Sequence, residues 1–258
     1  MSSLNGAHAL VTGAGRGIGA AIVTSLAEAG ARITLLGRDR AVLDTHAATL
    51  PASAQAHVVV GDVTDAASVT AAFADARSAH GEIAILINNA GVAASAPFST
   101  IDDAAWMSIL DANLTGTFRC CREVVPAMLA ARAGRIVNVA STAGLVGGAY
   151  IAAYTAAKHG VIGLTRALAA ELTPKGITVN AVCPGFTETA MLDRTLDTIT
   201  GTTGRTRDAA AGALLSRNPL GRFVRPDEVA RIVAWLCAPE SAAVTGQAIV
   251  IDGGETLR

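Results

Sequence analysis

The chain has 258 residues, of which 51% are hydrophobic and 16% charged, with a formal net charge of −1. It can therefore bury a large core in one domain, and it has no basic surplus of the kind that binds nucleic acid or an anionic membrane. No apolar run reaches the roughly 18 residues that a membrane-spanning helix needs.

Short apolar runs alternate with helical patterns along the chain. The seven runs expected to form strands span residues 8–13, 31–37, 56–63, 83–91, 134–141, 176–185 and 246–254. Between them, helices are expected at 17–30, up to about Leu50, after an N-cap at Asp65, within 101–132 and at 152–172. This order predicts strand–helix units repeated from one end of the chain to the other.

The strand candidates are apolar throughout rather than alternating, which is typical of strands covered on both faces. Strand–helix alternation predicts a parallel sheet with right-handed crossovers. We therefore predict an α/β fold, with one doubly wound sheet of about seven strands in a single domain over 1–258. Residues 186–218 lack a strand pattern and are polar in their middle. We expect them to form an excursion that covers a site.

The cysteines and histidines do not form a metal-binding pattern. The four cysteines include no CxxC pair, and the five histidines form neither HxxxH nor HExxH. We expect reduced, mostly buried thiols and no metal site. The first residues lack a charged segment followed by an apolar one, so we expect no signal peptide and a cytoplasmic protein.

A glycine-rich turn joins the first strand to the first helix. The segment "VTGAGRGIGAAI" contains four glycines, Gly13, Gly15, Gly17 and Gly19. Glycine permits positive φ and lets the backbone approach a pyrophosphate at a helix N-terminus. Its place after the first strand favours dinucleotide binding over a purely structural turn.

The second strand is expected to end near the adenosine ribose. Sites specific for NAD usually carry an acidic residue there, but this chain has Gly37 followed by Arg38. A guanidinium fits a 2′-phosphate, and Arg16 could pair with the same group. This pattern favours NADPH over NADH, although both arginines could simply be solvated. At the end of the third strand, Asp62 and Val63 are candidates to contact the adenine.

Tyr154 and Lys158 are four residues apart and therefore share a face of the predicted helix at 152–172. A neighbouring ammonium lowers the pKa of a tyrosine and makes it useful for proton transfer. Ser141 ends the fifth predicted strand, where its hydroxyl could hold a carbonyl oxygen. Such pairs also occur by chance on helix faces, but here the pair accompanies the glycine turn and a strand-end serine.

Together these motifs resemble the short-chain dehydrogenase/reductase family, and especially its 3-oxoacyl-thioester reductases. The family's T-G-x-x-x-G-x-G corresponds to Thr12–Gly19, its N-N-A-G to Asn88–Gly91, and its Y-x-x-x-K to Tyr154–Lys158. Its asparagine, serine and P-G turn correspond to Asn113, Ser141 and Pro184–Gly185. The resemblance implies a Rossmann-like NAD(P)-binding domain over the whole chain.

The resemblance also implies roles for these residues. Tyr154 exchanges a proton with the substrate oxygen, Ser141 orients that oxygen, Lys158 holds the nicotinamide ribose, and Asn113 positions a water beside Lys158. Asn88 could equally be a structural linker. The implied cofactor-binding residues are Thr12, Gly13, Gly15, Arg16, Gly17, Ile18, Gly19, Gly37, Arg38, Asp62, Val63, Asn89, Ala90, Gly91, Tyr154, Lys158, Pro184, Gly185, Thr187 and Thr189.

The expected substrate pocket is mostly apolar, which favours an acyl, alicyclic or aryl ketone over a sugar. Its candidates are Ala93, Ala94, Leu145 to Tyr150, Phe186, Met191, Leu192, Leu196 and Ile199. About half of them could simply pack the excursion, and Tyr150 could be a core residue. The partner would be a carbonyl substrate, free or linked to an acyl carrier protein or coenzyme A. The resemblance places basic residues at the mouth, and Arg132 and Lys175 are the candidates, with Arg205 and Arg207 for coenzyme A phosphates. All four could be ordinary surface cations.

Three functions fit the sequence to different degrees. The leading one is an NADPH-dependent reductase of a 3-oxoacyl thioester, as a homotetramer. A second is a catabolic NAD(P)-dependent dehydrogenase of a small, alicyclic or aryl alcohol. A third is a non-catalytic dinucleotide-sensing protein, which is disfavoured because Asn113, Ser141, Tyr154 and Lys158 are all present.

Overall fold

The computed structural model describes residue 4 and residues 6–257, so both ends of the predicted 1–258 domain lie outside the described residues. A single parallel sheet forms the centre of the molecule, with seven strands in the order β3-β2-β1-β4-β5-β6-β7. All seven strand predictions are confirmed. The strands are β1 (His8–Thr12), β2 (Arg32–Gly37), β3 (His57–Val60), β4 (Ile85–Asn88), β5 (Gly134–Val139), β6 (Ile177–Pro184) and β7 (Ala248–Ile251).

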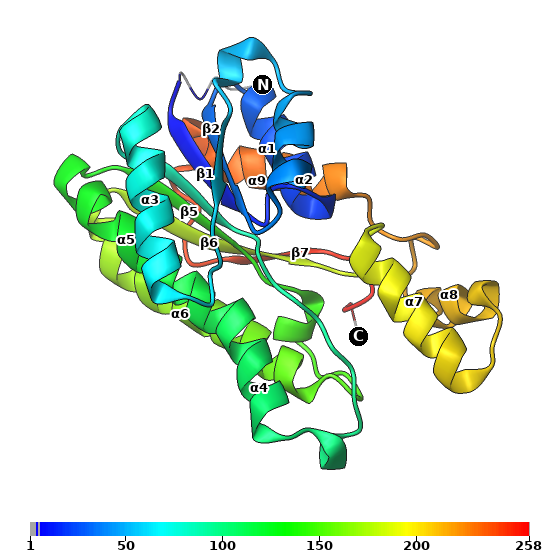
Figure 1. Cartoon of the computed structure of the whole chain (residues 1–258). Coiled ribbons are helices and arrows are strands. Elements are labelled where there is room, and N and C mark those ends of the chain that lie inside the picture. Colours follow the sequence, from blue (N-terminus) through cyan, green and yellow to red (C-terminus); the bar gives the residue numbers. More distant parts are fainter. Residues whose placement is uncertain (1–3, 5, 258) are drawn as a thin grey trace.

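Helices cover both faces of the sheet (Figure 1). One face is covered by α1 (Gly17–Glu28), α2 (Arg40–Ala47) and α9 (Pro226–Cys237), and their apolar residues share a core with β1 and β2. The other face is covered by α3 (Ala66–His80), α5 (Gly116–Ala131) and α6 (Ala152–Leu172). Two separate apolar cores therefore hold the sheet between them, as the continuous apolar strands predicted.

The remaining helices lie beyond the sheet. They are α4 (Asp103–Leu110), a π-helical turn (Asp111–Thr115), α7 (Ala190–Thr203) and α8 (Arg207–Leu215). Short 3₁₀ turns occur at Ala52–Ala54, Phe98–Thr100, Thr142–Gly144, Thr173–Lys175 and Pro239–Ser241. The expected N-cap is confirmed, since the Asp65 carboxylate accepts hydrogen bonds from the backbone of Ala67 and Ser68.

The strand order reverses between β3-β2-β1 on one side and β4 to β7 on the other. The loops that follow β1 and β4 therefore diverge to opposite faces and leave room for a ligand at the carboxyl edge of the sheet. The glycine turn, the N-N-A-G segment, Ser141 and the P-G turn all follow strands at this edge. The topology thus collects motifs from across the whole sequence at one place.

Two helices, α7 and α8, lie within residues 186–218, where the sequence predicts an excursion from the sheet. We call α7 and α8, residues 190–215, the α7–α8 lobe; Figure 1 shows it projecting from the body of the molecule. Leu192, Leu196 and Ala210 are its buried centre. Among the residues that the structure describes, no helix has both the length and the apolar character to cross a membrane. Nor do the described residues include a group of three or more side chains placed to hold a metal ion.

Candidate active site

The glycine turn leaves no room for side chains on its inner side. Gly13 has a φ of +64°, and a Cβ there would lie 2.9 Å from the Asn89 amide nitrogen. A Cβ on Gly19 would collide with the carbonyl oxygen of Gly13, and one on Gly17 would lie 3.0 Å from the Thr189 methyl group. The turn therefore needs glycine for its own close packing as well as for an approaching ligand.

Thr12 and Asn89, two of the predicted cofactor residues, hold this turn in place. The Thr12 side chain is buried, and its hydroxyl accepts hydrogen bonds from the backbone of Asn89 and Ala90, each at 3.0 Å. The Asn89 amide donates to the carbonyls of Thr12 and Gly13 at 3.0 and 3.1 Å. These contacts join the loop after β1 to the loop after β4 and thereby fix the floor of the site.

The two arginines expected beside a 2′-phosphate reach the surface beside carboxylates. Arg16 lies 3.3 Å from Asp39, and Arg38 lies 3.8 Å from Asp62. The arginine side chains remain 70% and 72% exposed, so both can still reach a ligand. Asp39, which also caps α2, was not considered from the sequence because it lies two residues past the position where an acid is expected. It makes this corner less positive than the arginines alone suggest.

Tyr154 and Lys158 lie on one face of α6, as predicted from their spacing. The Lys158 side chain is buried, and its ammonium donates a hydrogen bond of 2.8 Å to the Val139 carbonyl at the end of β5. The ammonium lies 5.6 Å from the centre of the Tyr154 ring. Ser141 follows the same strand, and its hydroxyl lies against the Tyr154 phenol. The structure therefore brings Ser141, Tyr154 and Lys158 together.

Asn113 sits in the π-helical turn between α4 and α5. Its amide donates to the carbonyls of Val92 and Ile109 at 2.8 and 2.9 Å, which locks the side chain. Its Oδ1 is buried and accepts no hydrogen bond from the described residues. A Cβ on Gly91 would lie 2.5 Å from this oxygen and 3.7 Å from the Lys158 ammonium. Asn113 therefore presents an acceptor on the side where Lys158 lies, as a π-bulge at a functional site often does.

Burial changes the proton affinities of this group. It raises the pKa of Tyr154, and the hydrogen bond with Ser141 opposes that rise. Burial also lowers the pKa of Lys158 to about 8. The sequence predicts that Lys158 lowers the Tyr154 pKa, but in the protein without a cofactor this pKa is raised. The reason is desolvation, which disfavours the charged forms of both side chains and outweighs an ammonium that does not touch the phenol.

The segment after β6 carries Thr187 and Thr189, which the family resemblance assigns to the nicotinamide carboxamide. The Thr187 hydroxyl donates to the Gly185 carbonyl at 3.0 Å, and the Thr189 hydroxyl donates to the Thr187 carbonyl at 3.2 Å. Thr189 also packs against Gly17, so this segment lies directly beside the glycine turn. The narrow glycine cradle, the buried Asn113 oxygen and the adjacent Lys158 ammonium together fit a nicotinamide dinucleotide.

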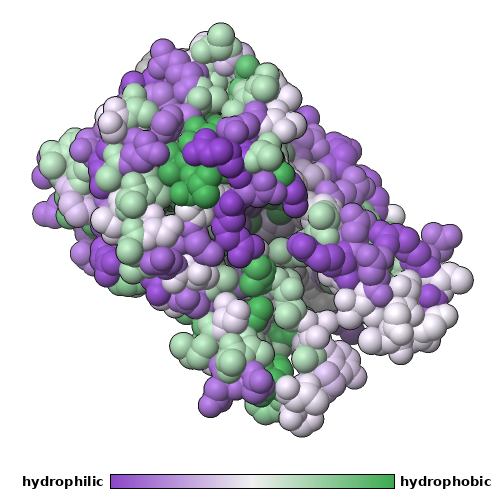
Figure 2. Space-filling view, viewed as in Figure 1, coloured by the Kyte–Doolittle hydropathy of each residue, from purple (hydrophilic) through white to green (hydrophobic). Residues whose placement is uncertain are grey.

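The substrate candidates divide into two groups. Leu192 and Leu196 are buried inside the α7–α8 lobe, and Phe186 and Ile199 pack against them, so these residues support the lobe. Ala93, Ala94, Val146 and Tyr150 are exposed, while Leu145 and Met191 are half-buried. Figure 2 shows the surface hollowed between the α7–α8 lobe and the part of the molecule that carries α4. The exposed group is the one available to a substrate.

Tyr150 is not a core residue. Its side chain is 66% exposed, and its φ of +67° is unusual for a bulky residue. Its carbonyl accepts a hydrogen bond of 2.8 Å from the Ala96 backbone, which joins the loop after β5 to the loop after β4. Tyr150 thus precedes α6 rather than sharing its face with Tyr154.

The expected basic mouth is not found within one chain. Arg132 ends α5 just before β5, and Lys175 lies just before β6. In a parallel sheet, residues that precede strands lie at the opposite edge from Ser141, so neither cation flanks the site of its own chain. Arg207 is paired with Asp193 and Asp197 within the α7–α8 lobe, whereas Arg205 is exposed between α7 and α8.

A buried polar chain behind the site was missed in the sequence. The Asn88 amide donates to the Asn138 Oδ1 at 2.9 Å, and the Asn138 amide donates to the Thr165 hydroxyl at 2.9 Å. Asn88 is therefore a structural linker between β4, β5 and α6, one of its two predicted roles. No local pattern reveals Asn138 or Thr165, because their partners are distant in sequence.

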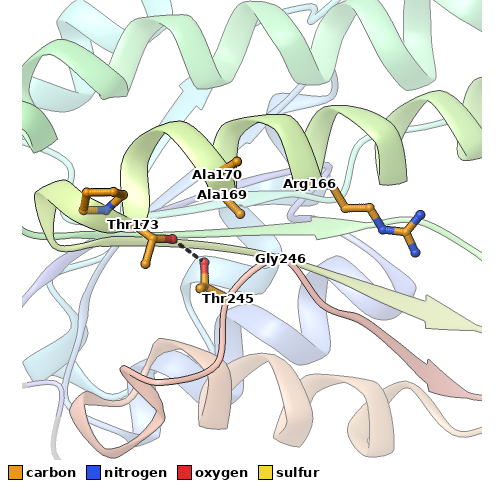
Figure 3. Close-up of a pocket in the computed structure, with 7 residues that line it drawn as sticks. Arg166, Ala169, Ala170, Thr173, Thr245 and Gly246 are labelled. Carbon is orange, nitrogen blue, oxygen red and sulfur yellow. Dashed lines mark hydrogen bonds between the residues drawn. The ribbon is translucent and has the colours of Figure 1, made fainter.

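The surface has two hollows, and the second includes the predicted site residues Thr189 and Leu192. One, of about 410 Å³, lies between the last turns of α6 and the loop before β7 and includes Arg166, Thr173 and Thr245 (Figure 3). Its two threonine hydroxyls are bonded to each other at 3.0 Å. The other, of about 440 Å³, lies between α7 and α8. Neither includes a residue of the proton-transfer group.

Comparison with known proteins identifies the family. The sequence matches short chain dehydrogenase over residues 7–199. A Streptomyces violaceoruber protein, named for a ketoacyl reductase of the granaticin polyketide synthase, is 43% identical over 95% of this chain and 92% of its own. The 3-oxoacyl-acyl-carrier-protein reductase FabG of Vibrio harveyi is 38% identical over 98% of both chains.

A solved structure has the same fold over nearly its full length. Actinorhodin polyketide ketoreductase, crystallised as a single-residue variant with NADPH, is 38% identical and aligns with a TM-score of 0.93 over 99% of both chains. Family motifs, sheet order and relatives all agree. The chain therefore belongs to the short-chain dehydrogenase family of oxidoreductases, as its motifs predicted.

Proposed function

We propose that this protein is an NADPH-dependent ketone reductase whose substrate is a 3-oxoacyl thioester. The observation that carries the proposal is the group formed by Ser141, Tyr154 and Lys158, with Asn113 fixed beside them. The names of the relatives, a polyketide ketoacyl reductase and a fatty-acid 3-oxoacyl reductase, support the substrate class. The exposed, mostly apolar loops around the hollow support an acyl chain over a sugar.

Each member of the group has one task in the proposed reaction. The Ser141 hydroxyl donates a hydrogen bond to the substrate oxygen, and Tyr154 transfers its proton to that oxygen as the alcohol forms. A raised pKa keeps Tyr154 protonated at neutral pH, which suits the reducing direction. Lys158 supplies positive charge near the phenol. The Asn113 oxygen lies on the path by which Tyr154 can regain its proton through Lys158. A bound nicotinamide cofactor would supply the hydride.

The preference for NADPH rests on Arg16 and Arg38. Both already lie near carboxylates, but exposed ion pairs of this kind are worth only about 0–1 kcal/mol. A phosphate with about two negative charges can therefore draw both guanidinium groups away from Asp39 and Asp62. The relative solved with NADPH supports the same preference. We further propose a cytoplasmic homotetramer that takes its substrate on an acyl carrier protein or coenzyme A.

The first experiment compares both cofactors with a panel of substrates. The panel contains acetoacetyl-CoA, longer 3-oxoacyl thioesters, simple ketones and secondary alcohols. Turnover of the thioesters with NADPH at the highest kcat/KM is the expected result. Turnover of simple ketones without the thioesters would overturn the substrate class. Oxidation of alcohols with NAD⁺ as the best reaction would favour the dehydrogenase alternative.

The second experiment removes the proton donor. Tyr154→Phe is expected to lower kcat by about 100-fold or more, because general acid catalysis contributes at least that much. The dissociation constant for NADPH should stay close to the wild-type value. The chain has two tyrosines, so Tyr150→Phe is the matched loss of a phenolic hydroxyl. Activity of Tyr154→Phe within a few-fold of wild type would exclude Tyr154 as the acid.

A further inference from the structure

The segment that carries Thr187 is held by a second segment of the chain that returns from the α7–α8 lobe. Thr187 and Val224 form a parallel β-bridge. The Val224 amide donates to the Phe186 carbonyl and the Glu188 amide donates to the Val224 carbonyl, each at 2.9 Å. Val224 is buried, so the bridge is an internal contact rather than a surface one.

This bridge determines which way the Thr187 backbone faces. In a parallel pair, the residue opposite the bonding residue directs its own N–H and C=O away from that partner. The Thr187 backbone therefore faces away from Val224. Its carbonyl is engaged by the Thr189 hydroxyl, and Thr189 lies against Gly17 of the glycine turn. The position of Val224 consequently decides how the Thr187 backbone is presented beside that turn.

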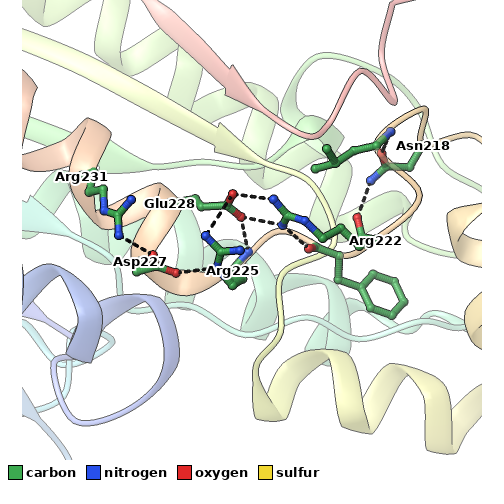
Figure 4. Close-up of polar contacts among 8 residues, drawn as sticks. Asn218, Arg222, Arg225, Asp227, Glu228 and Arg231 are labelled. Carbon is green, nitrogen blue, oxygen red and sulfur yellow. Dashed lines mark hydrogen bonds and ion pairs between the residues drawn. The ribbon is translucent and has the colours of Figure 1, made fainter.

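One carboxylate fixes the segment on both sides of Val224. The two Glu228 oxygens accept hydrogen bonds from the Arg222 guanidinium at 2.8 and 2.7 Å. The same carboxylate accepts from the Arg225 backbone amide at 2.8 Å. Figure 4 shows Glu228 between the two arginines, and Asp227 between Arg225 and Arg231. Arg222 and the Arg225 amide hold the pKa of Glu228 at about 2, so the carboxylate stays charged at all working pH values.

Glu228 is itself anchored to the helix that starts at the glycine turn. It lies in the first turn of α9, whose apolar residues Val229 and Val233 pack with Ile22 and Leu26 of α1. A continuous set of contacts thus runs from the glycine turn through α1, α9 and Glu228 to Val224 and Thr187. These contacts connect the Thr187 segment to the helix that begins at the glycine turn.

We propose that Glu228, acting through Arg222 and Val224, is a positioning residue for the nicotinamide half of the cofactor. The inference rests on the proposed function, because it takes a nicotinamide dinucleotide as the ligand. Glu228 is not one of the residues proposed to act on the substrate, which are Ser141, Tyr154 and Lys158. Its role is to hold the Phe186–Glu188 segment at a fixed distance from the glycine turn, and the adenosine half of the ligand does not depend on it.

The test measures binding of a whole and a half ligand to Glu228→Gln by calorimetry. NADP⁺ is the whole ligand, and adenosine 2′,5′-bisphosphate, which lacks the nicotinamide, is the half. Loss of the charged contacts is expected to raise the Kd for NADP⁺ by about tenfold. The Kd for the bisphosphate should stay within twofold of wild type. Equal weakening of both ligands, or of neither, would overturn the proposal.

Asp227→Asn is the matched control, because Asp227 is the adjacent carboxylate in the same helical turn. It pairs with Arg225 at 3.1 Å and Arg231 at 2.9 Å but does not hold the backbone beside Val224. Both ligands should bind this variant as they bind wild type. An equal loss of NADP⁺ affinity in this variant would mean that the loss of any negative charge in this helical turn weakens binding. It would contradict a specific positioning role for Glu228.

A second variant and a second readout guard against a folding defect. Arg222→Lys keeps the charge but removes the two-point contact with Glu228, so a smaller selective loss of NADP⁺ affinity is expected. Faster amide exchange at Val224 and Glu188, with unchanged exchange in β1, would accompany it. Unchanged exchange together with unchanged affinity would contradict the proposal. If wild type binds neither ligand, the proposed function itself fails; if wild type binds both and the variants show no selective loss, only the positioning role fails.

Discussion

Single residues at this site do their work through burial and close neighbours. Tyr154 and Lys158 are both shifted toward their uncharged forms, since burial raises the pKa of the phenol and lowers that of the ammonium to about 8. A protonated phenol is the form that a reductase needs at neutral pH.

Arg38 offers a test of cofactor choice at the scale of one residue. Arg38→Ala is expected to lower the preference for NADPH over NADH, as a ratio of kcat/KM values, by about tenfold or more. The reason is the loss of the charge-assisted contact that we propose between Arg38 and the 2′-phosphate, worth roughly 1.5–3 kcal/mol. Steady-state kinetics with both cofactors provide the measurement.

Arg40→Ala is the control for that substitution. Arg40 lies two residues further along and pairs with Asp44 on the exposed face of α2. It should leave the ratio unchanged. An equal preference for both cofactors in wild type would contradict the role of Arg38 before any substitution is made.

At the scale of elements, the α7–α8 lobe differs from the layers beside the sheet. It has a small buried centre of its own, and its helices carry glycines at exposed positions. Around Gly201 in α7 nothing lies within 4 Å of the place where a Cβ would stand. Glycine in a helix interior costs about 0.5–1 kcal/mol relative to alanine, so Gly201 lowers the stability of α7.

Gly201→Ala is therefore expected to stabilise α7 locally by about 0.5–1 kcal/mol. The measurement is amide hydrogen exchange, which should slow within α7 and remain the same in the helices beside the sheet. Gly116→Ala in α5 is the contrasting variant, because its Cβ would lie 3.0 Å from the Val63 Cβ and 3.2 Å from the Val63 backbone carbonyl oxygen. That variant should lower the melting temperature. Unchanged or faster exchange in α7 of Gly201→Ala would contradict the expectation.

At the scale of the whole molecule, the edge of the sheet opposite the active site contains a buried histidine. His8 in β1 is 1% exposed; its Nδ1 donates to the Gly81 carbonyl at 2.8 Å, and its Nε2 lies 2.9 Å from the Thr34 hydroxyl. Burial lowers the pKa of His8 from 6.5 to about 4, and nearby His80 and Arg32 act in the same direction. The ring is thus neutral in the folded protein.

This histidine predicts acid sensitivity of the folded state. Below pH 6.5 His8 is protonated in the unfolded chain, whereas in the folded chain it stays neutral down to about pH 4. The free energy of unfolding therefore decreases as the pH falls from 6.5 to about 4. A shift of this size corresponds to roughly 3 kcal/mol by pH 4. Urea unfolding between pH 7 and 4 should show this loss, and His8→Gln should reduce it. NMR titration of the His8 ring above pH 6 would contradict the cause, and His159→Gln, at an exposed position, is the control.

Much of this architecture was determined by the sequence alone. The strands and the span of α6 follow from local apolar patterns, because burial on both faces demands continuous apolar strands. The pairing of Tyr154 with Lys158 follows from the helical repeat. The glycine turn is recognisable from the spacing of its own glycines between a strand and a helix, because glycine adopts the positive φ that Gly13 and Gly17 have. Each of these depends on residues within a few positions of one another.

The tertiary structure decided everything that depends on distant neighbours. It placed Asp39 beside Arg16, put Arg132 and Lys175 at the far edge of the sheet, and turned Leu192 into the α7–α8 lobe. It also reversed the expected direction of the Tyr154 pKa, since desolvation is set by the packing of the whole fold. Glu228 and Thr187 lie 41 positions apart in the sequence, and only the return of the chain from the lobe brings their segments together. Local pattern determines which elements form, whereas charge, burial and contact arise only when those elements pack.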